Sequence, residues 1–337
     1  MILAGQRWHD EPVACAGLLV IGDPHVGSRR PGRRRDADWP DAVLAKLERC
    51  VEIANKRNLA PILLGDLFDR AVEPDESLKI RLIRLFRKFR HMPIANVGNH
   101  DIRHTTLSDG DSLAVLGAAD VLHVVARSGP VMDFRVGARR LGLGMTPYGQ
   151  EIPRDVRGLF EADSVLWCTH HDIAFEGAYP RSIPPFAIEG CQLIVNGHVH
   201  ATKKPVRTGP TLWTNPGNIS RLSVDQIGHV PCAWVLGADG DLVPEPLPHA
   251  ADVFDLTGRL VAAADGGAVA EAVQGAFAAL LEAEASMDVT KSDDGSILAD
   301  EIRARFARED TPEAVRAIIE ALFAEAVERR NGRRFSA

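Results

Sequence analysis

The 337-residue sequence has few cysteines, no long apolar run and no general excess of positive charge. Its five cysteines are odd in number and scattered, without the short-spaced pair of a zinc clip or redox motif. No apolar run reaches the roughly 18 residues of a membrane-spanning helix, and the N-terminus lacks a basic segment followed by the hydrophobic core of a secretory signal. We therefore expect a cytoplasmic protein with no membrane partner.

The formal net charge of -7 argues against a globally basic nucleic-acid-binding protein, because nonspecific affinity for phosphates comes from Lys and Arg. Positive charge is concentrated locally in the segment GSRRPGRRRD, which contributes Arg29, Arg30, Arg33, Arg34 and Arg35. A guanidinium group binds a phosphate through two parallel hydrogen bonds, so these arginines could bind a DNA backbone. The alternative is a solvated loop without a ligand.

Short apolar runs, in contrast, are frequent between residue 16 and about residue 250. Runs such as AGLLVIGD, APILLGDLFD and CQLIVNGHVH are rich in Val, Ile and Leu and end in Gly, Asp or Asn, as buried strands do. Helical patterns lie between several of them, for example DAVLAKLERCVEIANKRN, which places Val43, Leu47 and Val51 near one face. Alternating strands and helices predict a layered α/β core.

The composition changes after about residue 252, where Ala, Glu and Arg become abundant in helical patterns. The segment TPEAVRAIIEALFAEAVERR starts with Thr311 as a plausible N-cap and Pro312 at the first helical position. The sequence therefore predicts two domains, residues 1–250 and a small C-terminal helical region at 251–337. This region could pack on itself, cap the active site, form a homodimer or dock a partner helix.

Side chains that can bind metal ions follow five of the predicted strands, in the motifs GDPH, GDLFD, GNHD, CTHHD and GHVH. Loops at the carboxyl ends of strands converge in α/β sheets, so we expect these motifs to meet. Asp, His and Asn without Cys suit Mn²⁺, Fe²⁺ or Zn²⁺. A carboxylate such as Asp66 can bridge two cations about 3.5 to 4 Å apart, an arrangement that serves phosphate-ester hydrolysis.

This ordered set of motifs resembles the calcineurin-like metallophosphoesterase superfamily over roughly residues 16–236. The resemblance implies an α/β fold, a four-layer α/β/β/α sandwich, here followed by the C-terminal helical region. It also implies two divalent metal ions, for which we expect Mn²⁺, with Fe²⁺, Zn²⁺ and Mg²⁺ as alternatives. A binding scaffold without catalysis is disfavoured because every expected position is filled.

The resemblance also assigns roles to individual residues. His100 matches a histidine that lies near the scissile phosphate, and Asp69 matches the acidic residue that orients it. His171 is the alternative to His170 as a ligand, and Asp101 is expected to brace its loop. The expected metal ligands are Asp23, His25 and His200 at one ion, Asn99, His170 and His198 at the other, and Asp66 as the bridge.

Shorter similarities point to the DNA-repair nucleases of the SbcD type, namely DPHVGS, GDLFDR, MTPYG and NPGNISRLSVDQ. The chain departs from that group at Asn218, where serine is usual, and at Asp69, where some members have histidine. We expect a Mn²⁺-dependent DNA exonuclease or endonuclease, with an SbcC-type SMC-like ATPase as a candidate partner. The alternative is a phosphodiesterase or phosphatase that acts on nucleotides or other small phosphate esters.

Overall fold

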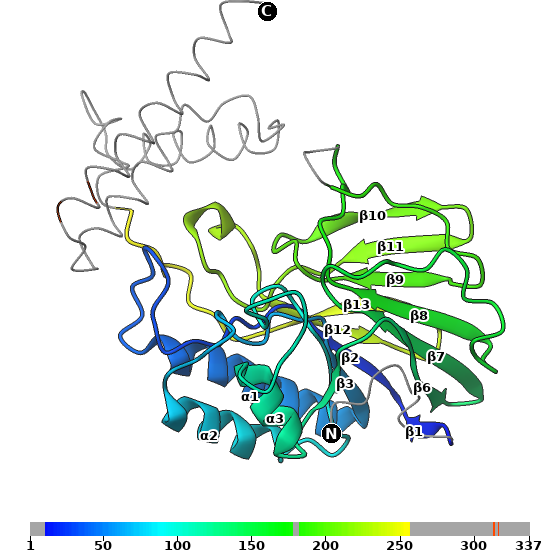
Figure 1. Ribbon diagram of the computed structural model, residues 1–337, viewed down its shortest axis with the longest axis horizontal. Coiled ribbons are helices and arrows are strands. Elements are labelled where there is room, and N and C mark those ends of the chain that lie inside the picture. Colours follow the sequence, from blue (N-terminus) through cyan, green and yellow to red (C-terminus); the bar gives the residue numbers. More distant parts are fainter. Residues whose placement is uncertain (1–10, 178–181, 257–312, 314–315, 317–337) are drawn as a thin grey trace, which may run out of the picture. The chain divides into compact units, whose positions relative to one another are not determined.

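The computed structural model describes residues 11–177 and 182–256, together with Glu313 and Arg316 (Figure 1). The chain divides into two compact units, one made of residues 1–30 and 36–252 and the other of residues 31–35 and 253–337. The predicted division at residue 250 stays a prediction, because most of the C-terminal helical patterns lie outside the described residues. No helix in the described ranges has the length and apolar character needed to cross a membrane.

Two mixed β-sheets form the first unit, which confirms the predicted α/β sandwich (Figure 1). The six-stranded sheet runs, in spatial order, β13 (Leu242–Pro246), β12 (Cys232–Leu236), β2 (Gly17–Ile21), β3 (Leu59–Leu63), β4 (Ile94–Asn96) and β5 (His123–Val125). The seven-stranded sheet runs β1 (Val13–Cys15), β6 (Gly129–Val136), β7 (Arg139–Thr146), β8 (Ser164–Thr169), β9 (Leu193–Asn196), β11 (Thr211–Asn215) and β10 (Lys203–Thr208).

Parallel strands occupy the centre of each sheet and end at matching heights. In the first sheet β2, β3 and β4 are parallel, and Leu63 pairs with both Ile21 and Ala95. In the second sheet β7, β8 and β9 are parallel, and Thr169 pairs with Thr146 and Asn196. The loops that follow these strands therefore start from one edge of each sheet.

Three helices cover the outer face of the six-stranded sheet (Figure 1). Helix α1 (Trp39–Arg57) begins after Asp38, whose side chain accepts a hydrogen bond from the N–H of Asp41, and α2 (Glu76–Phe86) begins after Asp75 in the same way. Helix α3 (Ser112–Ala118) is shorter, and a 3₁₀ turn, η1, spans Val224–Gln226. The helices bury residues such as Leu47 against strand residues Leu19 and Leu63.

The alternation of side chains along the strands builds two further cores. Leu18 and Ile62 point away from the helices and pack between the sheets against Leu166. On the other face of the second sheet, Trp167 and Trp213 are buried under irregular segments.

In the described residues, irregular segments form the fourth layer, where helices were expected. Segments 147–163 and 170–192 contain prolines, among them Pro147, Pro153, Pro184 and Pro185, which cannot donate helical hydrogen bonds.

Candidate metal centre

The five predicted motifs all lie at the carboxyl ends of strands, in the loops after β2, β3, β4, β8 and β9. Since these strands end in register, the loops converge, and the seven predicted ligands gather in one cluster. The cluster has two candidate groups of metal ligands that share Asp66. One group contains His25 and His100, and the other contains His170 and His198.

The backbone that carries these ligands adopts unusual conformations. Asp23 (φ 32°), His25 (φ 48°), Asp66 (φ 47°) and His198 (φ 70°) lie in the left-handed region, which non-glycine residues rarely adopt. Each such residue costs about 1–3 kcal/mol, so surrounding contacts must hold it in place. Four strained ligands at one site indicate that the fold orients these side chains before any cation binds.

Glycines allow the loops to approach the ligands closely. A Cβ atom at Gly98 would collide with the Asp66 carboxylate, and one at Gly197 would lie 2.7 Å from Asp23 Oδ1. The glycines that precede the ligands therefore leave the space that the carboxylates occupy.

A main-chain contact also joins the first and last motifs. A Cβ at Gly22 would collide with the carbonyl oxygen of Gly217, and the N–H of Ile219 donates to the oxygen of Gly22 over 2.9 Å. Asn218 in turn donates its N–H to the oxygen of His200, also over 2.9 Å. The backbones that carry Asp23 and His200 are thus connected without an intervening side chain.

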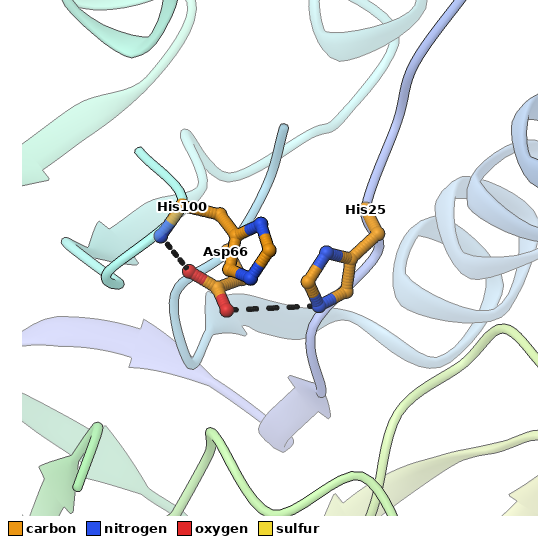
Figure 2. A group of neighbouring side chains, drawn as sticks. All are labelled: His25, Asp66 and His100. Carbon is orange, nitrogen blue, oxygen red and sulfur yellow. Dashed lines mark hydrogen bonds and ion pairs between the residues drawn. The ribbon is translucent and has the colours of Figure 1, made fainter. Parts of the chain in front are cut away.

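Asp66 occupies the centre of the cluster (Figure 2). One oxygen, Oδ1, accepts a hydrogen bond of 2.8 Å from the backbone N–H of His100. The other, Oδ2, lies 3.6 Å from His25 Nε2 and 3.2 Å from His170 Nε2. In the part of the chain that the structure describes, this buried oxygen makes no hydrogen bond, and it faces imidazoles on two sides.

His25 and His200 lie together on one side of Asp66. Their Nε2 atoms are 3.0 Å apart, and both side chains come from loops rather than from one element. Burial, followed by the influence of His25, lowers the pKa of His200 to about 3. His200 is therefore neutral at physiological pH, which is the form that binds a metal ion.

His170, His198 and Asn99 form the other side. Asn99 Oδ1 lies 3.2 Å from His170 Nε2 and 2.8 Å from His198 Nδ1. His170 Nδ1 is 3.0 Å from the carbonyl oxygen of Leu64, which fixes the ring with Nε2 toward Asp66. A backbone oxygen that accepts from the distal nitrogen is the usual support of a histidine ligand.

Asp23, which is predicted to bind the same ion as His25 and His200, also makes two contacts with this second side. Its Oδ2 accepts a hydrogen bond of 2.8 Å from the backbone N–H of His198. Its buried Oδ1 has no hydrogen-bond partner among the described residues and lies 3.7 Å from His170 Nδ1.

The electrostatics of the cluster favour positive charge. Burial opposes protonation of His170, but the carboxylates of Asp66 and Asp23 raise its pKa to about 9. Burial alone would raise the pKa of Asp66, yet His170 and His25 hold it below its ordinary value. The negative charge of Asp66 and Asp23 therefore favours the protonated form of His170. A bound cation would balance the same negative charge.

These observations fit two divalent cations. Within residues 11–177 and 182–256, three buried atoms of the cluster make no hydrogen bond, namely Asp23 Oδ1, Asp66 Oδ2 and His25 Nδ1. Most buried polar atoms in proteins have a hydrogen-bond partner, so three such atoms in one cluster indicate a site for a bound ligand. A set of carboxylate, imidazole and amide donors without thiolate suits Mn²⁺, Fe²⁺ or Zn²⁺.

His100 lies beside this cluster, and its ring is held at one nitrogen. Nδ1 is 2.7 Å from the main-chain carbonyl oxygen of Asp69. The Asp69 carboxylate instead reaches 3.6 Å from His25 Nδ1. Asp69 thus contacts His100 through the main chain rather than through the predicted acidic side chain.

Asp101 braces two of the loops, as expected. It is fully buried, and its carboxylate accepts hydrogen bonds from the backbone N–H groups of Phe68 (3.2 Å) and Gly98 (2.9 Å). Burial and the charge of Asp66 raise its pKa to about 7. His171, the alternative ligand, lies in neither candidate group, and its Nε2 is 2.8 Å from the oxygen of Gln150.

The arginine segment is divided between the two units. Arg29 and Arg30 are exposed in the first unit. In the second, Arg34 is only 3% exposed, and its guanidinium lies 5.4 Å from the centre of the Phe254 ring, which corrects its prediction as a phosphate ligand. Arg33 donates to the oxygen of Asp255, while Arg35 is exposed and stays a prediction, as do Arg29 and Arg30.

Three residues at the centre were not predicted as site residues. Tyr148, seen in the sequence only within MTPYG, lies with its ring 5.5 Å from that of His198. Asp172 Oδ1 lies 3.1 Å from His198 Nε2, and Asn196 is fully buried beneath the loops. Asp172 is the last residue of the motif CTHHD, and Asn196 directly precedes GHVH, which is the signal that could have indicated them.

Comparisons with known proteins agree with this geometry at the level of a family. The family model described as calcineurin-like phosphoesterase matches residues 17–202. A search of curated proteins finds no significant match.

Solved structures give only distant similarities. An archaeal phosphodiesterase is 13% identical, with 68% of this chain and 99% of that chain covered and a TM-score of 0.36. A 5'-nucleotidase precursor from Thermus thermophilus is 14% identical, with 81% and 60% covered and a TM-score of 0.42. The NAD nucleotidase of Haemophilus influenzae is 11% identical, with 70% and 51% covered and a TM-score of 0.41. Similarities at these TM-scores carry no weight for fold or substrate.

Proposed function

Because this chain belongs to the calcineurin-like phosphoesterase family, we propose that it is a Mn²⁺-dependent phosphodiesterase that cleaves DNA. Hydrolysis of phosphate esters is the chemistry of the family. The choice of a diester, of DNA and of Mn²⁺ is the proposal.

The observation that carries the proposal is the position of Asp66 between two sets of donors, with a buried oxygen that makes no hydrogen bond to any residue the structure describes. Divalent cations bound there would supply an activated water and would neutralise the charge that develops on the phosphate oxygens. The residues that would hold them are Asp23, His25 and His200 on one side, Asn99, His170 and His198 on the other, and Asp66 between them.

His100 is suited to the proton transfer that the reaction needs. Its Nδ1 is engaged by the oxygen of Asp69, so Nε2 is the atom available to a substrate. We assign Nε2 to stabilising the charged phosphate or to protonating the departing oxygen.

Two features support DNA as the substrate. The segments DPHVGS, GDLFDR and NPGNISRLSVDQ are similar to those of SbcD-type nucleases. Arg29 and Arg30, which follow the His25 motif, are exposed and could bind backbone phosphates. Small phosphate esters are the alternative substrates.

The test is a substrate panel for the purified full-length protein with Mn²⁺. Labelled duplex and single-stranded DNA are incubated beside cyclic nucleotides and phosphate monoesters, with Asp66→Asn as the inactive control. We expect DNA cleavage that EDTA abolishes and that the control lacks. Hydrolysis of the small esters alone would reject DNA as the substrate, and no hydrolysis of any ester would reject the enzyme.

We also propose action in the cytoplasm and an SbcC-type SMC-like ATPase partner for the C-terminal region. The support is the sequence pattern of apolar residues after Pro312. Co-purification of the full chain with such an ATPase from cells that express both would support the partner, and separate elution of the two proteins would contradict it.

A further inference from the structure

We propose that Asp172 is a positioning residue for the metal centre, which accepts a hydrogen bond from His198 and so directs the other nitrogen of that ring toward the cation. This inference rests on the proposed metal centre. The two groups involved, His198 Nε2 and Asp172 Oδ1, are 3.1 Å apart.

The two nitrogens of His198 face different partners. Nδ1 lies 2.8 Å from Asn99 Oδ1, so it is on the side of the shared carboxylate Asp66. Nε2 faces Asp172. A neutral imidazole carries one proton, and both nitrogens face an oxygen acceptor. With the proton on Nε2, where the Asp172 carboxylate accepts it, the Nδ1 lone pair and Asn99 Oδ1 can bind the same cation.

The fold fixes Asp172 in this place. It follows His170 by two residues in the loop after β8, and its backbone oxygen accepts a hydrogen bond of 2.7 Å from the N–H of Ile183. One loop therefore supplies both a predicted ligand, His170, and the support of a ligand from another loop. The Asp172 side chain is 40% exposed, so it lies at the border between the cluster and solvent.

Tyr148 restrains the same ring from another direction. Its ring centre lies 5.5 Å from that of His198 at an interplanar angle of 37°. Packing against Tyr148 limits the tilt of the imidazole, but it does not determine which nitrogen carries the proton. The two oxygens that face the ring decide that, Asn99 Oδ1 at Nδ1 and Asp172 Oδ1 at Nε2, and a proton held at Asp172 leaves Nδ1 for the cation. Removal of a carboxylate that orients a metal-bound histidine typically changes metal affinity or activity by roughly 10- to 100-fold.

The test compares Asp172→Ala, Asp172→Asn and the control Glu176→Gln. Glu176 lies in the same loop but pairs on the surface with Lys203 over 2.8 Å, so its replacement leaves the centre unchanged. Mn²⁺ binding to each full-length protein is measured by titration calorimetry after removal of metal. The thermal midpoint in EDTA is measured in parallel as a check on folding.

We expect Asp172→Ala to weaken one of the two Mn²⁺ sites by roughly 10- to 100-fold. Asp172→Asn should lose less Mn²⁺ affinity than Asp172→Ala, because an amide oxygen can still accept a hydrogen bond from Nε2–H. Glu176→Gln should bind Mn²⁺ like the wild type. At saturating Mn²⁺, kcat of Asp172→Ala should recover most of its value with little change in KM.

Wild-type affinity in both Asp172 variants would overturn the inference while leaving the metal centre intact. A wild-type protein that binds no Mn²⁺ would instead overturn the proposed function, and this inference with it. If Asp172→Ala does not fold, the test uses Asp172→Asn alone. A loss of Mn²⁺ affinity in this variant supports the positioning role of Asp172, and wild-type Mn²⁺ affinity rejects it.

Discussion

Among single residues, His100 separates catalysis from metal binding. Its backbone N–H, not its ring, makes the hydrogen bond to Asp66, and its ring is held by the main-chain oxygen of Asp69. A side-chain substitution at position 100 therefore removes the ring but keeps the N–H that bonds to Asp66. A substitution at position 69 keeps the main-chain oxygen that holds the ring.

We expect His100→Ala to lower kcat by roughly 10²- to 10⁴-fold, because it removes the group that transfers a proton. Mn²⁺ affinity should stay near the wild-type value, since alanine retains the backbone N–H that bonds to Asp66. Steady-state kinetics on the best substrate of the panel, with calorimetric Mn²⁺ titration, checks both expectations. Unchanged turnover in this variant would reject the role of His100, and lost Mn²⁺ binding would make it a ligand.

At the scale of elements, one buried amide connects the loops after β8 and β9. Asn196 Oδ1 accepts from Thr169 Oγ1 (2.7 Å) and from the N–H of His171 (3.1 Å). Its Nδ2 donates to the oxygen of His171 (3.0 Å) and to Asn215 Oδ1 (3.2 Å). This side chain at the end of β9 thus helps to hold the two loops that carry His170 and His198.

Asn196→Ala is expected to destabilise the metal-free protein by several kcal/mol, since each buried group left unsatisfied costs about 1–3 kcal/mol. Asn55→Ala is the matched control. Asn55 also makes two hydrogen bonds, to Lys88 and Arg90, but at an exposed position where water can replace it. Urea denaturation in EDTA gives both free energies of unfolding. Equal decreases in the free energy of unfolding of the two variants would show that the buried hydrogen bonds of Asn196 stabilise the protein no more than the exposed ones of Asn55.

The sequence predicted the strand ends and their motifs because both are local. Buried parallel strands have continuous apolar runs, and residues such as Asp66 and His170 directly follow them. The convergence of the loops then follows from the general architecture of α/β sheets.

Features that depend on pairing between distant segments could not be predicted in this way. Arg34 is buried because it pairs with Phe254, from a distant part of the chain, and nothing in GRRRD indicates this. The contact of Asp172 with His198 likewise depends on how two loops are placed. The irregular layer over Trp167 replaced expected helices because a buried apolar face can be covered by any segment with suitable side chains.

For the whole molecule, stability should depend on metal and pH together. His170 has a pKa of about 9 without metal, because Asp66 and Asp23 outweigh the effect of burial. Below that pH a cation must displace this proton, so Mn²⁺ affinity should rise as the pH increases toward about 9.

Mn²⁺ should therefore raise the thermal midpoint relative to EDTA, and by more at about pH 8 than at about pH 6. A ligand at about 100 times its dissociation constant stabilises the folded state by about 2.7 kcal/mol. Thermal unfolding followed by circular dichroism at both pH values, with and without Mn²⁺, measures the effect, and NaCl at equal ionic strength controls for screening. A shift that is equal at the two pH values would contradict the role of His170.

The backbone contact of Gly22 with Gly217 has a consequence for how the protein tolerates change. The separation of the first and last motifs is set by main-chain atoms in van der Waals and hydrogen-bond contact, not by the volume of apolar residues between the sheets. Substitution of other aliphatic residues between the sheets can change the free energy of unfolding while the catalytic geometry is preserved. A side chain added at either glycine would do the reverse, since it would push apart the backbones that carry Asp23 and His200 while the rest of the framework stays intact.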